Sequence, residues 1–247
     1  MTIKLLCEYG NTKIIKSVTE EKRVHIPDGF LSPAICALMY VISIGFLVLS
    51  WRRARATYSS ALTPLLAVSS AFIFAAQMIN FPITYGTSGH LVGGTFLSML
   101  LGPYAAILSM TIVLLMQALF FADGGLFTFG ANVFNMAIIG GLSFFLIKFL
   151  TKDLKRRKWL FPSVFAVSWL SVVLGALACG LEIGFSPVFS EAGGIAVTVP
   201  AMLFWHVLIG LGEAAITTTL VSQLQRLQPN VLNGLKILKG NPSEGIL

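Results

Sequence analysis

The chain has 247 residues, of which 56% are hydrophobic and only 11% are charged, and its mean hydropathy is +0.85. This composition excludes an ordinary water-soluble domain, and the length suits one compact membrane bundle rather than two domains. The formal net charge of +7 could indicate a nucleic-acid-binding protein. However, the basic residues lie beside hydrophobic runs, where such residues set membrane topology, so we expect no nucleic-acid partner.

The chain begins with a polar extension, residues 1–23, which carries five basic and three acidic residues. It is not followed by the apolar run of a signal peptide. We expect residues 24–225 to form a single transmembrane metal-binding domain and residues 226–247 to form a cytoplasmic tail.

Hydrophobic runs after the extension predict an all-α integral membrane protein with about seven transmembrane helices, since about 20 helical residues cross a bilayer core. The predicted spans are residues 33–51, 60–79, 91–102, 104–121, 133–150, 159–183 and 200–222. The span at 91–102 is flanked by glycines and is too short to cross upright by itself.

Basic clusters fix the predicted orientation. They follow the first, fifth and seventh spans, at Arg52, Arg53 and Arg55, at Lys152, Lys155, Arg156, Arg157 and Lys158, and at Arg226, Lys236 and Lys239. These clusters must all face one side, and the number of intervening spans allows it. By the positive-inside rule the N-terminus is then outside and the C-terminus is cytoplasmic, in a multi-pass protein of the prokaryotic cell membrane.

A polar segment at 80–94 precedes the short third span. We expect it to dip into the bundle, which is tolerated where backbone is buried in protein or lines a cavity. With the predicted orientation, His25, His90 and Asp123 all lie at the outer face, so the outer ends of the first four spans should form one shallow site.

His25 and His90 are two of only three histidines, and both lie in short polar segments beside hydrophobic runs. Imidazole is a common ligand for nickel, cobalt, zinc and copper, so this pair predicts a site for a transition-metal ion. The three cysteines, Cys7, Cys36 and Cys179, are too widely spaced for a disulfide framework or a CxxC metal site.

Five motifs then resemble one known family in order and spacing. They are HIPDGFLSP (25–33), QMINFP (77–82), GTSGHLVGG (86–94), ADGGLFTFGANVFNM (122–136) and HVLIGLGEA (206–214). Together they resemble the CbiM/NikM family, the substrate-binding membrane components of energy-coupling-factor (ECF) importers for nickel and cobalt. The resemblance extends from residue 24 to about residue 225.

The resemblance implies a near-planar site of four nitrogen atoms. Its donors would be the terminal amine, the amide nitrogen and imidazole of His25, and the imidazole of His90. In this chain, however, His25 follows Val24 and 23 further residues, and an amine within a peptide bond is not a ligand. We hypothesise that Val24 is an initiation codon read as methionine, or that a protease cuts after Arg23, so that residues 1–23 are absent from the mature protein.

Four polar residues are expected to support the metal ligands from outside, with simple loop hydrogen bonding as the alternative for each. They are Asp28, Asn80, Ser88 and Asn132. Asp28 also lies in a Pro-Asp-Gly turn, and direct ligation of the metal is a less favoured alternative for it. Asp123 is interpreted as a loop residue rather than a ligand, although its charge could attract cations.

His206 and Glu213 lie seven residues apart on one face of the last span, which predicts a structural or coupling role for them. An intramembrane protease is an alternative function. The segment Gly86–Gly89 matches the GxSG of rhomboid-like intramembrane serine proteases, with Ser88 as nucleophile and His206 as its base. The match is only four residues long.

The sequence contains no P-loop, so we expect a non-enzymatic transporter subunit. The family resemblance implies a transmembrane coupling subunit and two ATPase subunits, and any small accessory membrane protein would be a separate chain. A vitamin-binding ECF component is a further alternative that the five motifs disfavour. The residues leave nickel and cobalt open, with planar nitrogen coordination and HIPDG favouring nickel.

Overall fold

The computed structural model describes residues 25–58, 62–79, 81–82, 88–152 and 157–238. It confirms the predicted all-α membrane fold. Five helices are long and apolar enough to cross a membrane, and Thr63–Met78 is a shorter apolar helix. Val24 and the extension before it lie outside the described residues.

The helices follow the seven predicted spans in order. They are α2 (Pro33–Thr57), α3 (Thr63–Met78), α4 (Gly94–Leu101), α5 (Pro103–Phe121), the continuous run α6 (Phe129–Asn132), η4 (Val133–Ile138, a π-helix) and α7 (Ile139–Thr151), then α8 (Leu160–Gly184) and α9 (Ile195–Leu227). Short elements complete the described part: β1 (Phe81–Pro82), β2 (Ser88–Gly89), η5 (Arg157–Trp159), η6 (Pro187–Phe189), η7 (Pro229–Val231) and α10 (Asn233–Leu238).

The first and last predicted spans are shorter than the helices that form. The first helix continues to Thr57, and the last runs from Ile195 to Leu227 instead of 200–222. Apolar composition marks the part of a helix that lies in lipid, whereas backbone hydrogen bonding carries a helix onward past its first charged side chains. The sequence therefore predicted the membrane part of each helix better than its ends.

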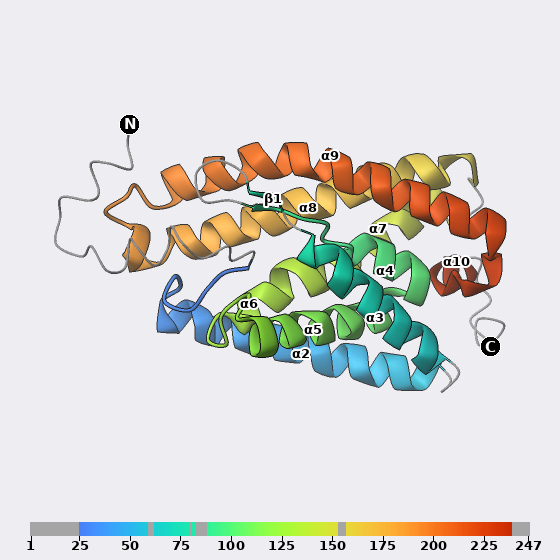
Figure 1. Ribbon diagram of the computed structural model, residues 1–247, viewed down its shortest axis with the longest axis horizontal. Coiled ribbons are helices and arrows are strands. Elements are labelled where there is room, and N and C mark those ends of the chain that lie inside the picture. The colour runs from blue at the N-terminus through green and yellow to red at the C-terminus, as the bar shows by residue number, and fades with distance from the viewer. Residues whose placement is uncertain (1–24, 59–61, 80, 83–87, 153–156, 239–247) are drawn as a thin grey trace.

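The two ends of the bundle drawn in Figure 1 differ in the charged residues that they contain. The described basic residues gather at the end where α2 finishes and α5 begins: Arg52, Arg53, Arg55, Lys148, Lys152, Lys158, Arg226 and Lys236. Four acidic residues lie toward the other end: Asp28, Asp123, Glu182 and Glu191. Since basic residues mark the cytoplasmic side, the end that carries residues 25–32 is the outer end.

Helix α4 lies in the middle of the bundle, and all eight of its residues are buried. It packs against α5, α7, α8, α9 and α10. Gly94 at its start approaches Gly140 of α7 so closely that a Cβ on either residue would lie 2.7 Å from the other's Cα. Small residues of this kind let helix backbones pack tightly within a membrane.

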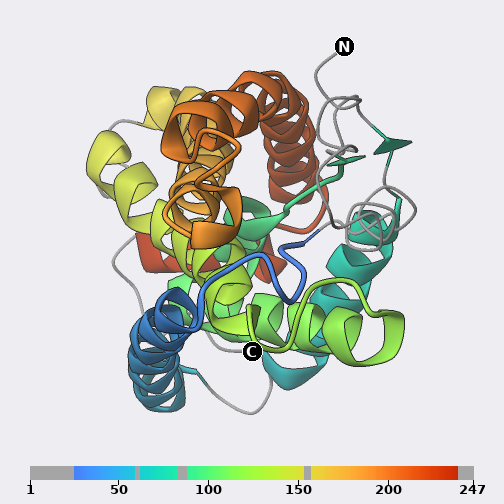
Figure 2. The same cartoon turned by 90° about the vertical axis from the view of Figure 1, so that its left-hand side faces the viewer.

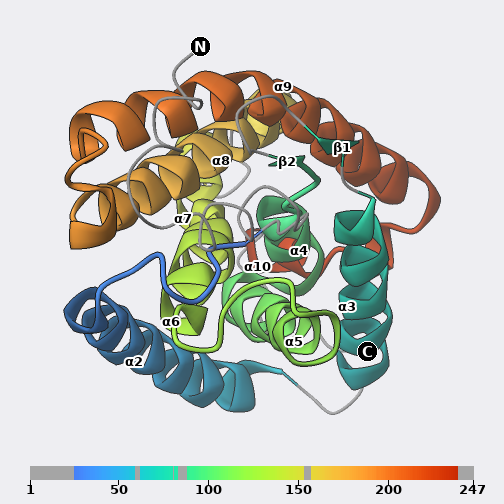
Figure 3. The same ribbon diagram turned by 60° about the vertical axis from the view of Figure 1, so that its left-hand side comes forward.

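The segment before α4 dips into the bundle as predicted. Figure 3 shows the chain running inward from β2 to α4 near the centre. The backbone N–H groups of Val92 and Gly93 both donate to the carboxylate of Glu213, which lies near the middle of α9. Polar backbone at this depth is therefore paired with protein, as a membrane interior requires.

Candidate metal centre

The first described residues run across the outer end of the bundle and are held there by the start of the α6 helix (Figure 2). Asn132 pairs with both backbone groups of Ile26: its Oδ1 accepts from Ile26 N at 3.0 Å, and its Nδ2 donates to Ile26 O at 3.1 Å. Ile26 O also accepts from Thr128 Oγ1 at 2.6 Å and from Gly125 N at 3.0 Å. The position of residue 26 is thus fixed by four hydrogen bonds to one loop and helix start.

Asp28, two residues after Ile26, adds further hydrogen bonds between this N-terminal segment and the turn before α6. Its carboxylate accepts backbone N–H groups from Leu126 at 3.0 Å, Phe127 at 2.8 Å and Thr128 at 3.2 Å. These groups lie just before α6, where free N–H groups and the helix dipole favour a negative charge. In this arrangement Asp28 organises the 126–128 turn.

His25 is buried at the centre of this attachment, with 6% of its surface exposed. One oxygen atom, Asp123 Oδ1, lies 3.3 Å from its backbone nitrogen and 3.2 Å from its Nδ1. The Nδ1 contact is a close approach without hydrogen-bond geometry, and Nε2 is buried without a hydrogen-bond partner. The amide nitrogen and Nδ1 therefore lie beside the same carboxylate oxygen, close enough together for one histidine to present both to a metal ion.

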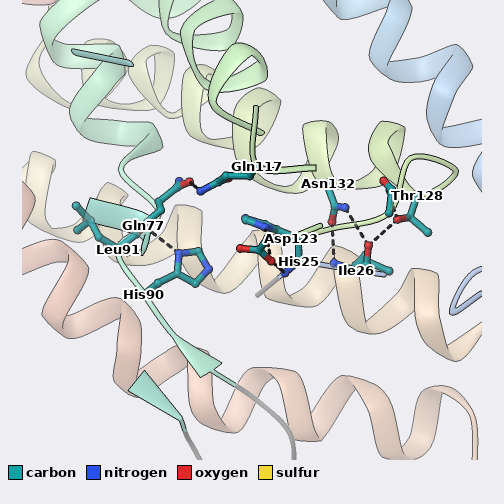
Figure 4. A network of polar contacts seen from close by, with 10 residues as sticks. His25, Ile26, Gln77, His90, Leu91, Gln117, Asp123, Thr128 and Asn132 are labelled. Carbon is teal, nitrogen blue, oxygen red and sulfur yellow. Dashed lines mark hydrogen bonds and ion pairs between the residues drawn. The ribbon is translucent and has the colours of Figure 1, made fainter. Parts of the chain in front are cut away.

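The ring of His90 lies next to that of His25, with their centroids 5.5 Å apart and their planes at 65° (Figure 4). His90 Nδ1 lies 3.0 Å from the carbonyl oxygen of Leu91. A carbonyl only accepts hydrogen bonds, so Nδ1 carries the proton and Nε2 of the neutral ring keeps its lone pair. Burial, and then the neighbouring imidazole of His25, lower the pKa of His90 below its ordinary value, which favours this neutral ring.

Two buried glutamines support the loop that carries His90. Gln77 Nε2 donates to the carbonyl oxygen of Val92 at 2.8 Å, and Gln117 Nε2 donates to Gln77 Oε1 at 2.9 Å (Figure 4). The chain of amides connects α5, α3 and the loop. A metal ligand is commonly held in place by such surrounding hydrogen bonds.

The predicted supporting residues divide into two groups. Asn132 and Asp28 hold the segment that carries His25, as described above. Asn80, the side chain of Ser88 and Val24 lie outside the described residues. His206 and Glu213 have different partners: His206 Nδ1 lies 2.7 Å from Met202 O of its own helix, whereas Glu213 binds the loop.

Asp123 was predicted from the sequence to be a loop residue, and no role was predicted for Gln77, Gln117 or Thr128. A signal existed for the glutamines, because a polar side chain inside an apolar helix is expensive unless it has a partner. Nothing local distinguished Asp123 from an ordinary loop residue. Its importance comes from contact with His25, which is 98 residues earlier in the chain.

Within the described ranges, no group of three or more His, Cys, Asp or Glu side chains is arranged to hold a metal ion. His25 and His90 supply two imidazoles, so any planar nitrogen site here needs backbone or terminal nitrogen atoms as its other donors. The His25 amide nitrogen, which lies with Nδ1 beside Asp123 Oδ1, is one candidate for such a donor.

Replacing Asp123 by asparagine should weaken nickel binding by about 10-fold, the lower end of the effect expected from changing a group that supports metal ligands. The reason is electrostatic. The carboxylate lies 3.2–3.3 Å from two His25 nitrogens, so its negative charge favours a divalent cation bound beside them, whereas a neutral amide has no such charge. Isothermal titration with Ni²⁺ in detergent would measure the change. Unaltered affinity would show that Asp123 acts only as a loop residue.

Comparison with known proteins gives a consistent result. The model of the CbiM family, described as a cobalt uptake substrate-specific transmembrane region, matches residues 25–231. A putative fused nickel transport protein NikMN of Archaeoglobus fulgidus is 42% identical over 209 residues, which are 85% of this chain and 68% of that protein. A putative metal transport protein of Haloquadratum walsbyi is 38% identical over 85% of this chain and 93% of its own length.

Solved structures agree with the sequence comparisons. The crystal structure of a truncated transition metal transporter superposes with a TM-score of 0.74 at 36% identity, over 82% of this chain and 99% of that one. The bundle described above is therefore shared with a transition metal transporter of known structure.

Proposed function

Because this chain belongs to the CbiM family, we propose that it binds Ni²⁺ or Co²⁺ at the His25–His90 centre and delivers the ion into the cell as the substrate-specific component of an ECF-type importer. It is a multi-pass membrane protein of a metal transport family, and the relatives are named for nickel or general metal transport. That relationship favours transport over the protease and vitamin-binding alternatives.

One observation carries the proposed ion site. The amide nitrogen and Nδ1 of His25 lie within 3.3 Å of one oxygen atom, Asp123 Oδ1, and the ring of His90 lies beside that of His25 with its Nδ1 occupied by Leu91 O. Nitrogen atoms of two distant segments are thus close together at one end of the bundle. Neutral imidazoles in a water-poor site suit a borderline metal ion rather than Ca²⁺ or Mg²⁺, which prefer oxygen ligands.

The fourth donor in this proposal is the amine of residue 24, in a mature chain that starts there. A terminal amine and the next amide nitrogen form a small chelate ring with a metal, and the imidazole of the same residue extends it. Planar nitrogen coordination of this type favours Ni²⁺. Cobalt remains the second candidate for the same donors.

Release into the cell needs an energy source that the proposed subunit does not supply by itself. We propose that it works with a transmembrane coupling subunit and two ATPase subunits. The family description as a substrate-specific region, which implies other components, supports this assignment.

Native mass spectrometry of protein expressed from its own start region should find a chain beginning with methionine at position 24 and carrying one Ni²⁺ or Co²⁺. The expected result follows from the need for a free amine next to the His25 amide nitrogen. A matched sample with the start fixed at Met1 should bind the ion much more weakly, because residue 24 then lies in a peptide bond. A full-length chain that binds one ion equally well would disprove the terminal-amine donor. A chain of either length that binds neither ion would disprove the proposed function.

A further inference from the structure

Glu213 is a buried carboxylate of α9 that accepts two hydrogen bonds from the loop before α4. It is 3% exposed and lies near the middle of the 33-residue helix α9. Its two oxygen atoms accept the N–H groups of consecutive loop residues, Oε2 from Val92 and Oε1 from Gly93, each at 2.8 Å. Charge-assisted pairs of this kind are strong in a medium of low dielectric constant.

The same loop is held from its other side by α3. Gln77 Nε2 donates to Val92 O at 2.8 Å, so the backbone around Val92 is bound by one side chain from α9 and another from α3. Only two residues separate His90 from Gly93, where the second Glu213 bond is made. A change in the position of α9 relative to α3 should therefore move the loop backbone next to His90.

The loop is tightly packed on the side of α3 and borders a pocket on the side of α9. On the α3 side the backbone is tightly packed: Gly93 has φ +77°, and a Cβ there would overlap Ile73. On the α9 side there is an open pocket of about 390 Å³, lined by His90, Leu91, Trp205, Leu208, Gly212 and Glu213, among others. The free volume thus lies between His90 and α9, in the direction in which Glu213 holds the loop.

We propose that Glu213 is a positioning residue that ties His90 to helix α9, so that outward movement of α9 draws His90 away from His25 and opens the metal site. This rests on the proposed function, since it assigns a means of release to the same centre. The two hydrogen bonds from Val92 and Gly93 attach the loop to α9. The open pocket on the α9 side leaves space into which the His90 ring can move. His25 keeps its position, because Asn132 and Asp28 bind its segment to another part of the bundle.

The test compares wild-type protein with Glu213→Ala and Glu213→Gln, each purified in detergent and titrated with Ni²⁺. Alanine removes both acceptors and should lower the affinity about 10-fold. Glutamine keeps one acceptor oxygen and should give an intermediate loss. At saturating Ni²⁺, the visible absorption spectrum of the alanine variant should differ from that of wild type, because His90 is no longer held in its wild-type position beside the metal.

Glu182→Gln is the matched control. Glu182 is also a buried carboxylate, 7% exposed, but its hydrogen bond comes from Asn135 Nδ2 at 2.7 Å and not from the loop. The Glu182→Gln substitution should leave both the Ni²⁺ affinity and the absorption spectrum unchanged. An equal loss in this control would show that buried charge in general is responsible, and would overturn the proposal.

Other outcomes separate the two proposals. Wild-type affinity and spectrum in Glu213→Ala, or reduced affinity with an unchanged spectrum, would overturn the positioning role while leaving the metal site intact. If Glu213→Ala aggregates, Glu213→Gln decides by the same criteria. Wild-type protein that binds neither Ni²⁺ nor Co²⁺ would instead count against the proposed function.

Discussion

Replacing His90 by alanine is expected to lower the affinity for Ni²⁺ by more than about 100-fold, since loss of a ligand should exceed the 10- to 100-fold cost of losing a supporting residue. The variant should still fold, because the described hydrogen bond of the ring is a local one to Leu91 O and the loop keeps its bonds to Glu213 and Gln77. Equilibrium binding of Ni²⁺ and size-exclusion chromatography in detergent would measure the two effects separately.

His25→Ala should have an equally large effect on affinity, because it removes the Nδ1 that lies beside Asp123. His206→Ala is the control, since this third histidine bonds only within α9, to Met202 O, among the contacts that the structure describes for its ring. It should bind Ni²⁺ as wild type does. Full affinity in either His25→Ala or His90→Ala would refute a site built from two imidazoles.

Gly125→Ala is expected to reduce Ni²⁺ affinity by about 100-fold, at the upper end of the range for changes outside the ligands. A Cβ at this position would overlap the carboxylate and backbone nitrogen of Asp28. Gly125 N also donates to Ile26 O, so the alanine side chain should push the 125–128 loop away from residues 26–28, which follow His25 directly. Overpacking of this kind also costs about 1–3 kcal/mol of stability. Thermal unfolding and Ni²⁺ titration would measure both effects.

Gly45→Ala provides the comparison for that variant. A Cβ on Gly45, in the middle of α2, would have no atom within 4 Å, so the substitution should be neutral or slightly stabilising and should leave Ni²⁺ binding unchanged. Wild-type affinity in Gly125→Ala would show that the Asp28 turn can shift without moving His25, and that the attachment of the N-terminal segment matters less than its contacts indicate.

Much of the fold could be predicted from the sequence because lipid imposes simple rules on it. Apolar runs marked every spanning helix, and basic residues such as Arg52 and Lys152 marked the cytoplasmic end. The short run at 91–102 was expected not to cross by itself, and helix α4 is indeed only eight residues long. These features depend on composition and length, which a single sequence contains in full.

The polar contacts around the candidate site were harder to predict, for a physical reason. Asn132 and Ile26 are 106 residues apart, and Glu213 and Val92 are 121 residues apart. A local pattern shows that a polar side chain in an apolar segment needs a partner, but not which partner it finds. The π-helix at 133–138 was equally unpredictable, because it depends on tertiary packing rather than on intrinsic preference.

The burial of α4 has a consequence for how the protein is made. Eight helical residues extend only about 12 Å, less than half of a hydrocarbon core of about 30 Å, so this segment cannot be inserted as an independent span. Its neighbours α7, α8 and α9 are all synthesised after it. The segment with His90 is therefore expected to take its final place only after the last long helix has entered the membrane, because a nascent chain released before α9 lacks the Glu213 carboxylate that binds Val92 and Gly93.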